Sequence, residues 1–251
     1  DFLNNNIVYL DGGMGTLLQE KGLPVGELPE RWNLTHADVI TDIHREYFDA
    51  GSNVVSANSF GANGLKFSDN ELDQIISAAF DNAKKASELS ISDKEKFVAL
   101  DIGPLGRLLK PLGDLDFEEA VSLFAKTVKL GVKYGADLII IETMNDSYET
   151  KAAVLAAKEN SDLPIIVSNV YGADGKLMTG ADPAAMVTLL EGMGVDAIGA
   201  NCSLGPKQLT PIVKDILANA SVPTLLMPNA GLPKSIDGRT VFDVTADEFA
   251  D

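Results

Sequence analysis

Residues 138–142 read Leu-Ile-Ile-Ile-Glu, a short, continuously apolar run that ends in a carboxylate. A run of this kind is typical of a parallel strand that is buried on both faces. Six further runs share its shortness and apolar character and begin at Ile7, Val54, Phe97, Ile165, Ala197 and Thr224. Amphipathic helical patterns separate the runs, over residues 37–50, 71–89, 117–134, 147–159, 183–193 and 207–219, with another beginning near Asp247. This alternation predicts βαβ units and a mostly parallel sheet.

Every apolar run leads into a short polar residue; these are Asp11, Asn58, Asp101, Glu142, Asn169, Asn201 and Asn229. Polar groups at the carboxyl ends of successive parallel strands are typical of the catalytic face of a TIM barrel. An open doubly wound sheet would gather its ligand groups at one switch point instead. We therefore predict an α/β fold of the TIM (β/α)8 type. Because only seven strand-helix units occupy the sequence, we expect a single domain over residues 1–251 that is truncated before the eighth strand.

The composition argues against several functional classes. Twenty Lys and Arg residues against 37 Asp and Glu give a net charge of −17, which disfavours nucleic acid and anionic membranes as partners. No apolar run reaches the length of a membrane span, and the first residues are unlike a secretion signal. The single cysteine rules out an intrachain disulfide, so we expect a cytoplasmic protein. No lysine ends a strand and no P-loop pattern occurs, which disfavours a Schiff-base aldolase and a nucleotide site.

Cys202 follows the sixth apolar run and precedes Ser, Leu, Gly and Pro. A lone cysteine is most often a small buried hydrophobe. At this position, however, its thiol would face the barrel mouth beside the N-terminus of the next helix, as a nucleophile or as a metal ligand. A cysteine–histidine pair is disfavoured because His36 and His44 fall in the first loop and helix, away from every strand end. A metal site needs companion ligands, and the chain has no second cysteine.

Three other stretches offer polar groups at strand ends. Residues 11–16, Asp-Gly-Gly-Met-Gly-Thr, form either a turn that requires positive φ or a loop whose N–H groups receive a carboxylate while Asp11 receives an ammonium. Glu142 ends the most apolar run, so its carboxylate needs a hydrogen bond or a cation, such as a substrate ammonium. Asn229 is equally consistent with a simple turn. Asp101 and Glu142 could form a glycosidase pair, but one Trp in the chain gives little for sugar stacking.

Seven ordered segments resemble the homocysteine S-methyltransferase family, and are most similar to its members that form the N-terminal barrel of cobalamin-dependent methionine synthase. They are residues 10–16, 58–62, 101–104, 141–143, 179–183, 201–206 and 228–231. The resemblance implies a zinc ion held by three thiolates, of which Cys202 matches one. The other two belong to a Gly-Gly-Cys-Cys-Gly segment that this sequence lacks. It also implies that Asn229 occupies the fourth zinc position until the substrate arrives.

The same resemblance implies a substrate and a reaction. Six residues are assigned to homocysteine binding: Asp11, Gly12, Gly13, Asn58, Glu142 and Asn201. The zinc would convert the homocysteine thiol to a thiolate, which takes a methyl group and becomes methionine. The expected donor is methylcobalamin fed by methyltetrahydrofolate, with the cobalamin and folate modules elsewhere in the polypeptide or on a partner protein.

Several alternatives stay open. One alternative is that the methyl donor is betaine or S-methylmethionine. Another is that the chain is a non-catalytic homocysteine-binding fragment, because a barrel without its last strand cannot assemble the three-thiolate site. Exposed strand edges beside the gap predict a homo-oligomer or a marginally stable chain.

Overall fold

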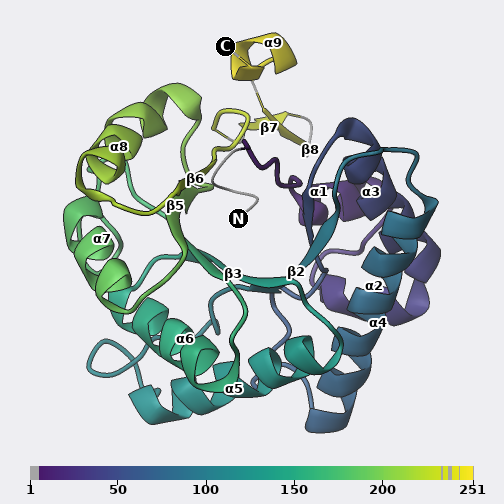
Figure 1. Ribbon diagram of the computed structural model, residues 1–251, viewed down its shortest axis with the longest axis horizontal. Helices are drawn as coiled ribbons and strands as arrows, with labels where there is room; N and C mark the ends of the chain where they lie inside the picture. The colour runs from purple at the N-terminus through teal and green to yellow at the C-terminus, as the bar shows by residue number, and fades with distance from the viewer. Residues whose placement is uncertain (1–5, 233, 237–238, 243, 251) are drawn as a thin grey trace. The chain divides into compact units, whose positions relative to one another are not determined.

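The computed structural model describes residues 6–232, 234–236, 239–242 and 244–250 (Figure 1). The chain divides into two compact units. The first unit is formed by the residues up to Ile140 together with Ala152–Ile165. The second unit is formed by Ile141–Lys151 together with the residues from Ile166 onward. Whether residues 1–251 form a single domain stays a prediction.

The elements of the first unit follow the predicted alternation of strands and helices. In chain order they are α1 (Met14–Glu20), η2 (Pro29–Arg31), α2 (Trp32–Thr35), α3 (Ala37–Ala50), β1 (Val54–Ser56), α4 (Asp69–Leu89), β2 (Phe97–Ile102), α5 (Phe117–Lys133), the start of β3 (Leu138–Met144) and the end of α6 (Ser147–Asn160). The three short helices before α3 have no counterpart in the sequence prediction, because each is too short to show an apolar stripe.

The second unit continues the same pattern. It holds the end of β3, the start of α6, all of β4 (Ile165–Asn169) except Ile165, α7 (Pro183–Gly192), β5 (Ala197–Asn201), α8 (Pro206–Asn219), β6 (Thr224–Met227), β7 (Lys234–Ile236), β8 (Arg239–Val241) and α9 (Ala246–Ala250). The antiparallel pair of β7 and β8 is not predicted by the sequence pattern. All seven predicted helices are present, so the α/β prediction is confirmed.

The strands β1 to β6 occur in the sheet in the order of the chain. In the first unit β1 pairs in parallel with β2, with Val54 opposite Phe97. In the second unit β5 pairs in parallel with β4 and with β6. Gly199 permits the second of these pairings, because a Cβ there would lie 2.1 Å from the Leu225 carbonyl oxygen. The parallel sheet is therefore confirmed for six of the seven predicted strands.

The first predicted strand is the exception. Leu10 makes only an isolated parallel bridge to Val54, and the Tyr9 carbonyl accepts the N–H groups of Asn53 and Val54 at 2.7 and 3.1 Å. Ile7 is 76% exposed and Tyr9 54% exposed. The prediction of a buried strand over residues 7–10 was wrong, because apolar character alone does not say whether a segment is covered on both faces.

Each unit has its own apolar core. In the first unit α3 and α4 lie side by side (Figure 1), and α3 buries Ile40, Ile43 and Phe48 completely. Helix α3 ends at Gly51, whose φ of 108° favours glycine. In the second unit every residue of β4 and β5 is buried. Helix α7 begins after Asp182, whose side chain accepts the Ala185 N–H at 2.9 Å.

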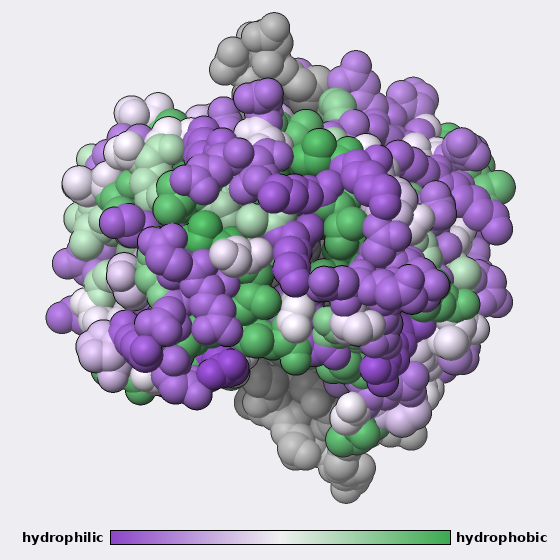
Figure 2. Space-filling model, turned by 90° about the horizontal axis from the view of Figure 1, so that it is seen from below, coloured by the Kyte–Doolittle hydropathy of each residue, from purple (hydrophilic) through white to green (hydrophobic). Residues whose placement is uncertain are grey.

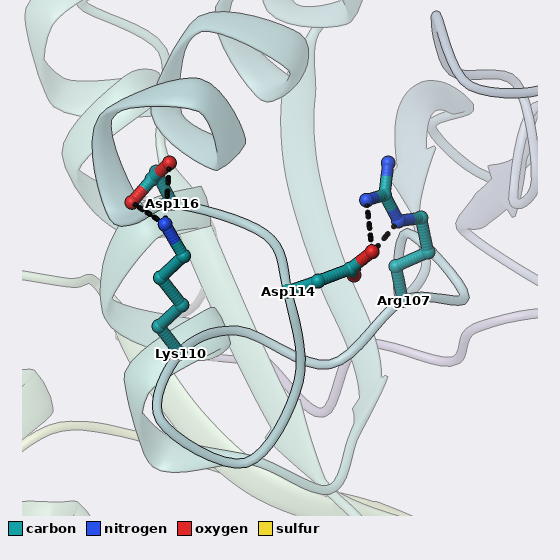
Figure 3. A network of polar contacts seen from close by, with 4 residues as sticks. All are labelled: Arg107, Lys110, Asp114 and Asp116. Atoms are coloured by element: carbon teal, nitrogen blue, oxygen red, sulfur yellow. Dashed lines mark hydrogen bonds and ion pairs between the residues drawn. The ribbon is translucent and has the colours of Figure 1, made fainter.

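The loop after β2 is held by two ion pairs on its surface (Figure 3). Arg107 pairs with Asp114 at 2.8 Å, and Lys110 with Asp116 at 2.8 Å. Exposed pairs of this kind contribute little to stability individually. The same loop requires glycine at position 113, because a Cβ there would lie 2.0 Å from the Leu108 carbonyl oxygen.

Figure 2 shows one face, on which hydrophilic residues predominate and hydrophobic residues form small groups between them, in keeping with the net charge of −17. Within the described part of the chain, no helix combines the length and apolarity needed to cross a membrane.

Candidate functional site

In the second unit, the ends of β3, β4 and β5 meet around one carboxamide. Asn201 Oδ1 accepts the Thr143 N–H at 3.0 Å and the Ser168 hydroxyl at 2.5 Å. Asn201 Nδ2 donates to Thr143 Oγ1 at 2.8 Å and to Cys202 Sγ at 3.3 Å. Thr143 Oγ1 and Cys202 Sγ lie 3.9 Å apart. We call Thr143, Ser168, Asn201 and Cys202 the cysteine corner.

The backbone of the cysteine corner is strained. Thr143, Cys202 and Ser203 have φ values of 59°, 57° and 59°, and they are the non-glycine residues with positive φ in the described part of the chain. The left-handed conformation costs roughly 1–2 kcal/mol per non-glycine residue and persists only where the surroundings impose it. Here the Cys202 N–H donates to the Met227 carbonyl of β6 at 3.0 Å, and the Leu204 N–H donates to the Cys202 carbonyl at 2.6 Å.

Glu142 precedes this corner on β3, and its environment disfavours charge. Burial raises the pKa of Glu142 to about 7. Near neutral pH the carboxyl group is therefore poised between its neutral and charged forms. A cation placed beside it, such as an ammonium, would favour the carboxylate, as the sequence prediction for Glu142 requires.

The Cys202 thiol is also held in its neutral form. Burial raises the pKa of this thiol, and the charge of Glu142 raises it further, whereas the hydrogen bonds from Thr143 and Asn201 lower it. Since only a thiolate is a good nucleophile or metal ligand, the protein alone leaves the sulfur unreactive at neutral pH. A nearby cation would be needed to change this.

The residues present do not fit a zinc ion by themselves. No group of three His, Cys, Asp or Glu side chains arranged to hold a metal occurs among the described residues. The neighbours of Cys202 Sγ are an amide nitrogen and a hydroxyl, and the chain has no other cysteine. Asn229 follows β6, and its N–H donates to the Leu204 carbonyl at 3.1 Å. Its proposed place as a temporary zinc ligand stays a prediction.

The predicted substrate loop of the first unit, Asp11–Gly13, leads into α1. Asp11 Oδ2 accepts the Ser56 N–H at 2.8 Å, which fixes the loop to the end of β1. Neither Gly12 nor Gly13 has positive φ, so the interpretation as a left-handed turn was wrong. Gly12 is required for space instead, because a Cβ there would lie 2.9 Å from the Tyr47 hydroxyl.

Tyr47 was missed as a functional candidate. Its hydroxyl lies 3.4 Å from the Gly13 carbonyl, to which it donates. Burial, together with the charges of Asp11 and Glu46, raises the pKa of Tyr47 to about 12, so the phenol remains a hydrogen-bond donor. The sequence showed Tyr47 only as part of the apolar stripe of α3, and that periodicity does not predict which group the Tyr47 hydroxyl contacts.

Asn58, the other predicted binding residue of the first unit, is 5% exposed. Its Nδ2 donates to the Pro29 carbonyl and to Asn33 Oδ1, each at 2.9 Å. Asn33 Nδ2 donates to the Asn58 carbonyl at 2.8 Å and to the Ile75 carbonyl at 3.3 Å. Asn82 Nδ2 donates to the Asn33 carbonyl at 3.0 Å. We call Asn33, Asn58 and Asn82 the asparagine cluster. The side chains of the asparagine cluster donate to backbone carbonyls of several segments and so hold these segments together. Contact of Asn58 with a substrate stays a prediction.

Comparison with known proteins agrees with the sequence resemblance. Two curated methionine synthases match nearly the whole chain: that of Mycobacterium tuberculosis (strain ATCC 25618 / H37Rv), 30% identical over 267 residues and 100% of the chain, and that of Mycobacterium leprae (strain TN), 29% identical over 99% of the chain. The chain spans only 22% of the length of each.

Solved structures share the fold. The homocysteine methyltransferase MmuM from Escherichia coli, in its metallated form, superposes with a TM-score of 0.80 at 21% identity, over 91% of this chain and 86% of that one. The carboxyl transferase domain of Rhizobium etli pyruvate carboxylase superposes less well, with a TM-score of 0.52 at 13% identity, over 88% of this chain and 36% of that one.

The strongest assignment comes from the family profile described as homocysteine S-methyltransferase, which matches residues 8–251. That match takes in the Asp11–Gly13 loop, Glu142 and the whole cysteine corner. The chain belongs to the homocysteine S-methyltransferase family.

Proposed function

We propose that this chain is the homocysteine-binding part of an enzyme that methylates homocysteine to methionine. One observation carries the proposal: the chain's only thiol, Cys202, and a carboxyl group with a raised pKa, Glu142, lie within electrostatic reach of each other at strand ends of one unit. Homocysteine carries an ammonium group, which Glu142 would receive, and a thiol, which would lie beside Cys202. We further propose that the parallel strands belong to a TIM-type barrel.

The proposed roles of the chain's own residues are binding and orientation. Glu142 would receive the substrate ammonium, which replaces the solvation that burial removes from the carboxylate. The loop Asp11–Gly13 would offer a carboxylate and exposed backbone, held in place by Tyr47. The contact with Glu142 would orient the substrate and needs no general base or covalent enzyme intermediate.

Zinc is proposed as the cofactor, with Cys202 as one of its ligands. When bound, the ion would lower the pKa of the homocysteine thiol. The other two thiolates are not in this sequence, and we propose that a segment of the same barrel outside it supplies them. A cytoplasmic location and association of copies through strand edges stay predictions.

The zinc proposal predicts a simple metal analysis. The chain, loaded with zinc and passed through a weak chelator, is expected to keep far less than one zinc per chain, because one thiolate does not make a tight site. A longer polypeptide that supplies two more cysteines is expected to keep one. Tight, stoichiometric zinc in the 251-residue chain would contradict the proposed ligand set.

Binding of homocysteine can be tested directly by calorimetry. We expect Glu142→Gln to weaken homocysteine binding at least about tenfold, which corresponds to 1.4 kcal/mol. Glu118→Gln, on the exposed first turn of α5, is the matched control and is expected to change nothing. Equal affinities for the Glu142→Gln chain and the original chain would remove Glu142 from the site.

The methyl donor is proposed to be methylcobalamin, supplied from methyltetrahydrofolate by other modules. The methionine synthases that the chain matches are several times its length, which leaves room in those proteins for such modules. A screen of methylcobalamin, betaine and S-methylmethionine with the zinc-competent polypeptide separates the alternatives. Methyl transfer from betaine or S-methylmethionine with no cobalamin module present would overturn the cobalamin proposal.

A further inference from the structure

The side chain of Asn201 has no free hydrogen-bonding position. A carboxamide offers two donor hydrogens and two acceptor lone pairs. Oδ1 uses its two lone pairs on the N–H of Thr143 and the hydroxyl of Ser168, and Nδ2 donates to Thr143 Oγ1 and Cys202 Sγ. The residue is 2% exposed. Direct contact between Asn201 and a substrate would therefore require one of these four bonds to break.

Three of these four bonds reach the two residues with left-handed backbone, Thr143 and Cys202, the second of which carries the sulfur. Asn201 contacts both Thr143 and Cys202, whose φ values are 59° and 57°. The bond to the Thr143 N–H holds the backbone of β3, while the bonds to Oγ1 and Sγ fix the two side chains relative to each other. Asn201 thus links the left-handed turn of β3 to that of β5 through one buried group.

We propose that Asn201 is a positioning residue that sets the direction of the Cys202 sulfur, with the Thr143 hydroxyl as its second anchor. This role differs from the predicted contact of Asn201 with the substrate, which stays a prediction. The geometric claim concerns only the four residues of the cysteine corner. Its importance for homocysteine activation rests on the proposed function, because only there does the direction of this sulfur matter.

A neighbouring asparagine provides the matched control. Asn169 ends β4 as Asn201 ends β5, and it is completely buried. Its Nδ2 donates to the Met144 carbonyl at 3.1 Å and to Thr150 Oγ1 at 3.2 Å. Loss of its side chain removes buried hydrogen bonds of similar kind without removing the donor to Cys202.

The test observes the sulfur position through the neighbouring carbon. Because Cys202 is the only cysteine, cysteine labelled with carbon-13 at Cβ gives one NMR signal from the chain. The spectra are recorded without metal at pH 6, where the thiol is protonated. We expect Asn201→Ala and Thr143→Val to shift or broaden this signal, as the side chain begins to sample several rotamers. Asn169→Ala is expected to lower stability and leave the signal in place.

Two results would overturn the proposal. The first is an unchanged signal in folded Asn201→Ala. The second is a change in Asn169→Ala as large as that in Asn201→Ala. If Asn201→Ala does not fold, Asn201→Leu and Thr143→Val decide, because they nearly keep the shape of the side chain and remove the carboxamide bonds or the hydroxyl without adding a charge. An unchanged signal in both would overturn the proposal. Homocysteine plays no part in this measurement, so failure of the proposed function would leave its result standing.

Discussion

The asparagine cluster of the first unit and the cysteine corner of the second are both built on a buried asparagine near the end of a parallel strand. In the asparagine cluster, Asn58 donates to a backbone carbonyl and to Asn33, which is itself bound to backbone. In the cysteine corner, Asn201 donates to a hydroxyl and to a thiol. The residue type is the same, but its partners differ in chemistry.

This difference separates bracing from positioning. The asparagine cluster ties helical and loop backbone to buried side chains, so its loss removes buried hydrogen bonds and is expected to affect stability. The cysteine corner binds one backbone group, the Thr143 N–H, and otherwise joins the side chains of Thr143, Ser168 and Cys202, so its loss is expected to change their geometry as well as to lower stability. Four predictions test this division, in order of decreasing effect.

The largest effect is expected in the asparagine cluster. Asn33→Ala removes the side-chain donor to the buried Asn58 carbonyl and the acceptor of one Asn58 Nδ2 hydrogen, and should lower the free energy of unfolding by about 4 kcal/mol. Urea unfolding measures it, with Asn70→Ala on the exposed first turn of α4 as control. The Cys202 NMR signal should not move in Asn33→Ala. A moved signal would mean that the cluster also positions the sulfur.

The next effect concerns His44 of α3, also in the first unit. Burial lowers its pKa from 6.5 to about 4, and neither ring nitrogen has a hydrogen-bond partner among the described residues. The unfolded chain binds this proton below pH 6.5 and the folded chain only below pH 4. Stability is therefore full above pH 6.5 and falls by about 3 kcal/mol as the pH drops to 4. His44→Leu should remove this loss, whereas the exposed His36→Gln should keep it.

The second unit should respond to pH with the opposite sign. The pKa of Glu142 is raised from 4.5 to about 7, so the folded chain keeps a proton that the unfolded chain has lost. The contribution of this group is full below pH 4.5 and is lost as the pH rises to 7, by about 2 kcal/mol for a partly exposed side chain. Unfolding of Glu142→Gln at pH 5 and pH 8 should lack this loss. An identical pH slope in both chains would contradict the assigned burial effect.

The smallest effect is expected from backbone strain in the turn after β5. Ser203→Gly removes the steric cost of its left-handed φ and should raise stability by less than about 1 kcal/mol. The matched change Ser122→Gly, inside α5, should lower stability by about 0.5 kcal/mol. Destabilisation by Ser203→Gly would show that its side chain contributes more than its backbone conformation costs.

Much of the fold was predictable because periodicity reports burial. The apolar runs from Val54 to Thr224 became strands β1 to β6, and the amphipathic stretches became helices within a few residues of their predicted limits. The prediction of a buried strand at Ile7 was wrong, because Ile7 and Tyr9 are exposed despite their apolar character. Periodicity describes what a side chain prefers and does not establish what covers it.

The candidate site was predictable only in part. Glu142, Asn201 and Cys202 were predicted as site residues because they follow apolar runs of the sequence, and the structure brings Asn201 and Cys202 together. Their partners Thr143 and Ser168 were not found, because strand register and left-handed backbone decide which hydroxyl meets the carboxamide. No linear pattern encodes that register.

The buried thiol of Cys202 has a consequence for the handling of the chain. Oxidation by peroxide starts from the thiolate, and burial raises the pKa of this thiol, so sulfenic acid should form slowly at neutral pH. The only disulfide open to a chain with one cysteine joins two molecules. Ageing in air should therefore yield cross-linked dimers at a slow rate, and a reductant should return them to monomer chains.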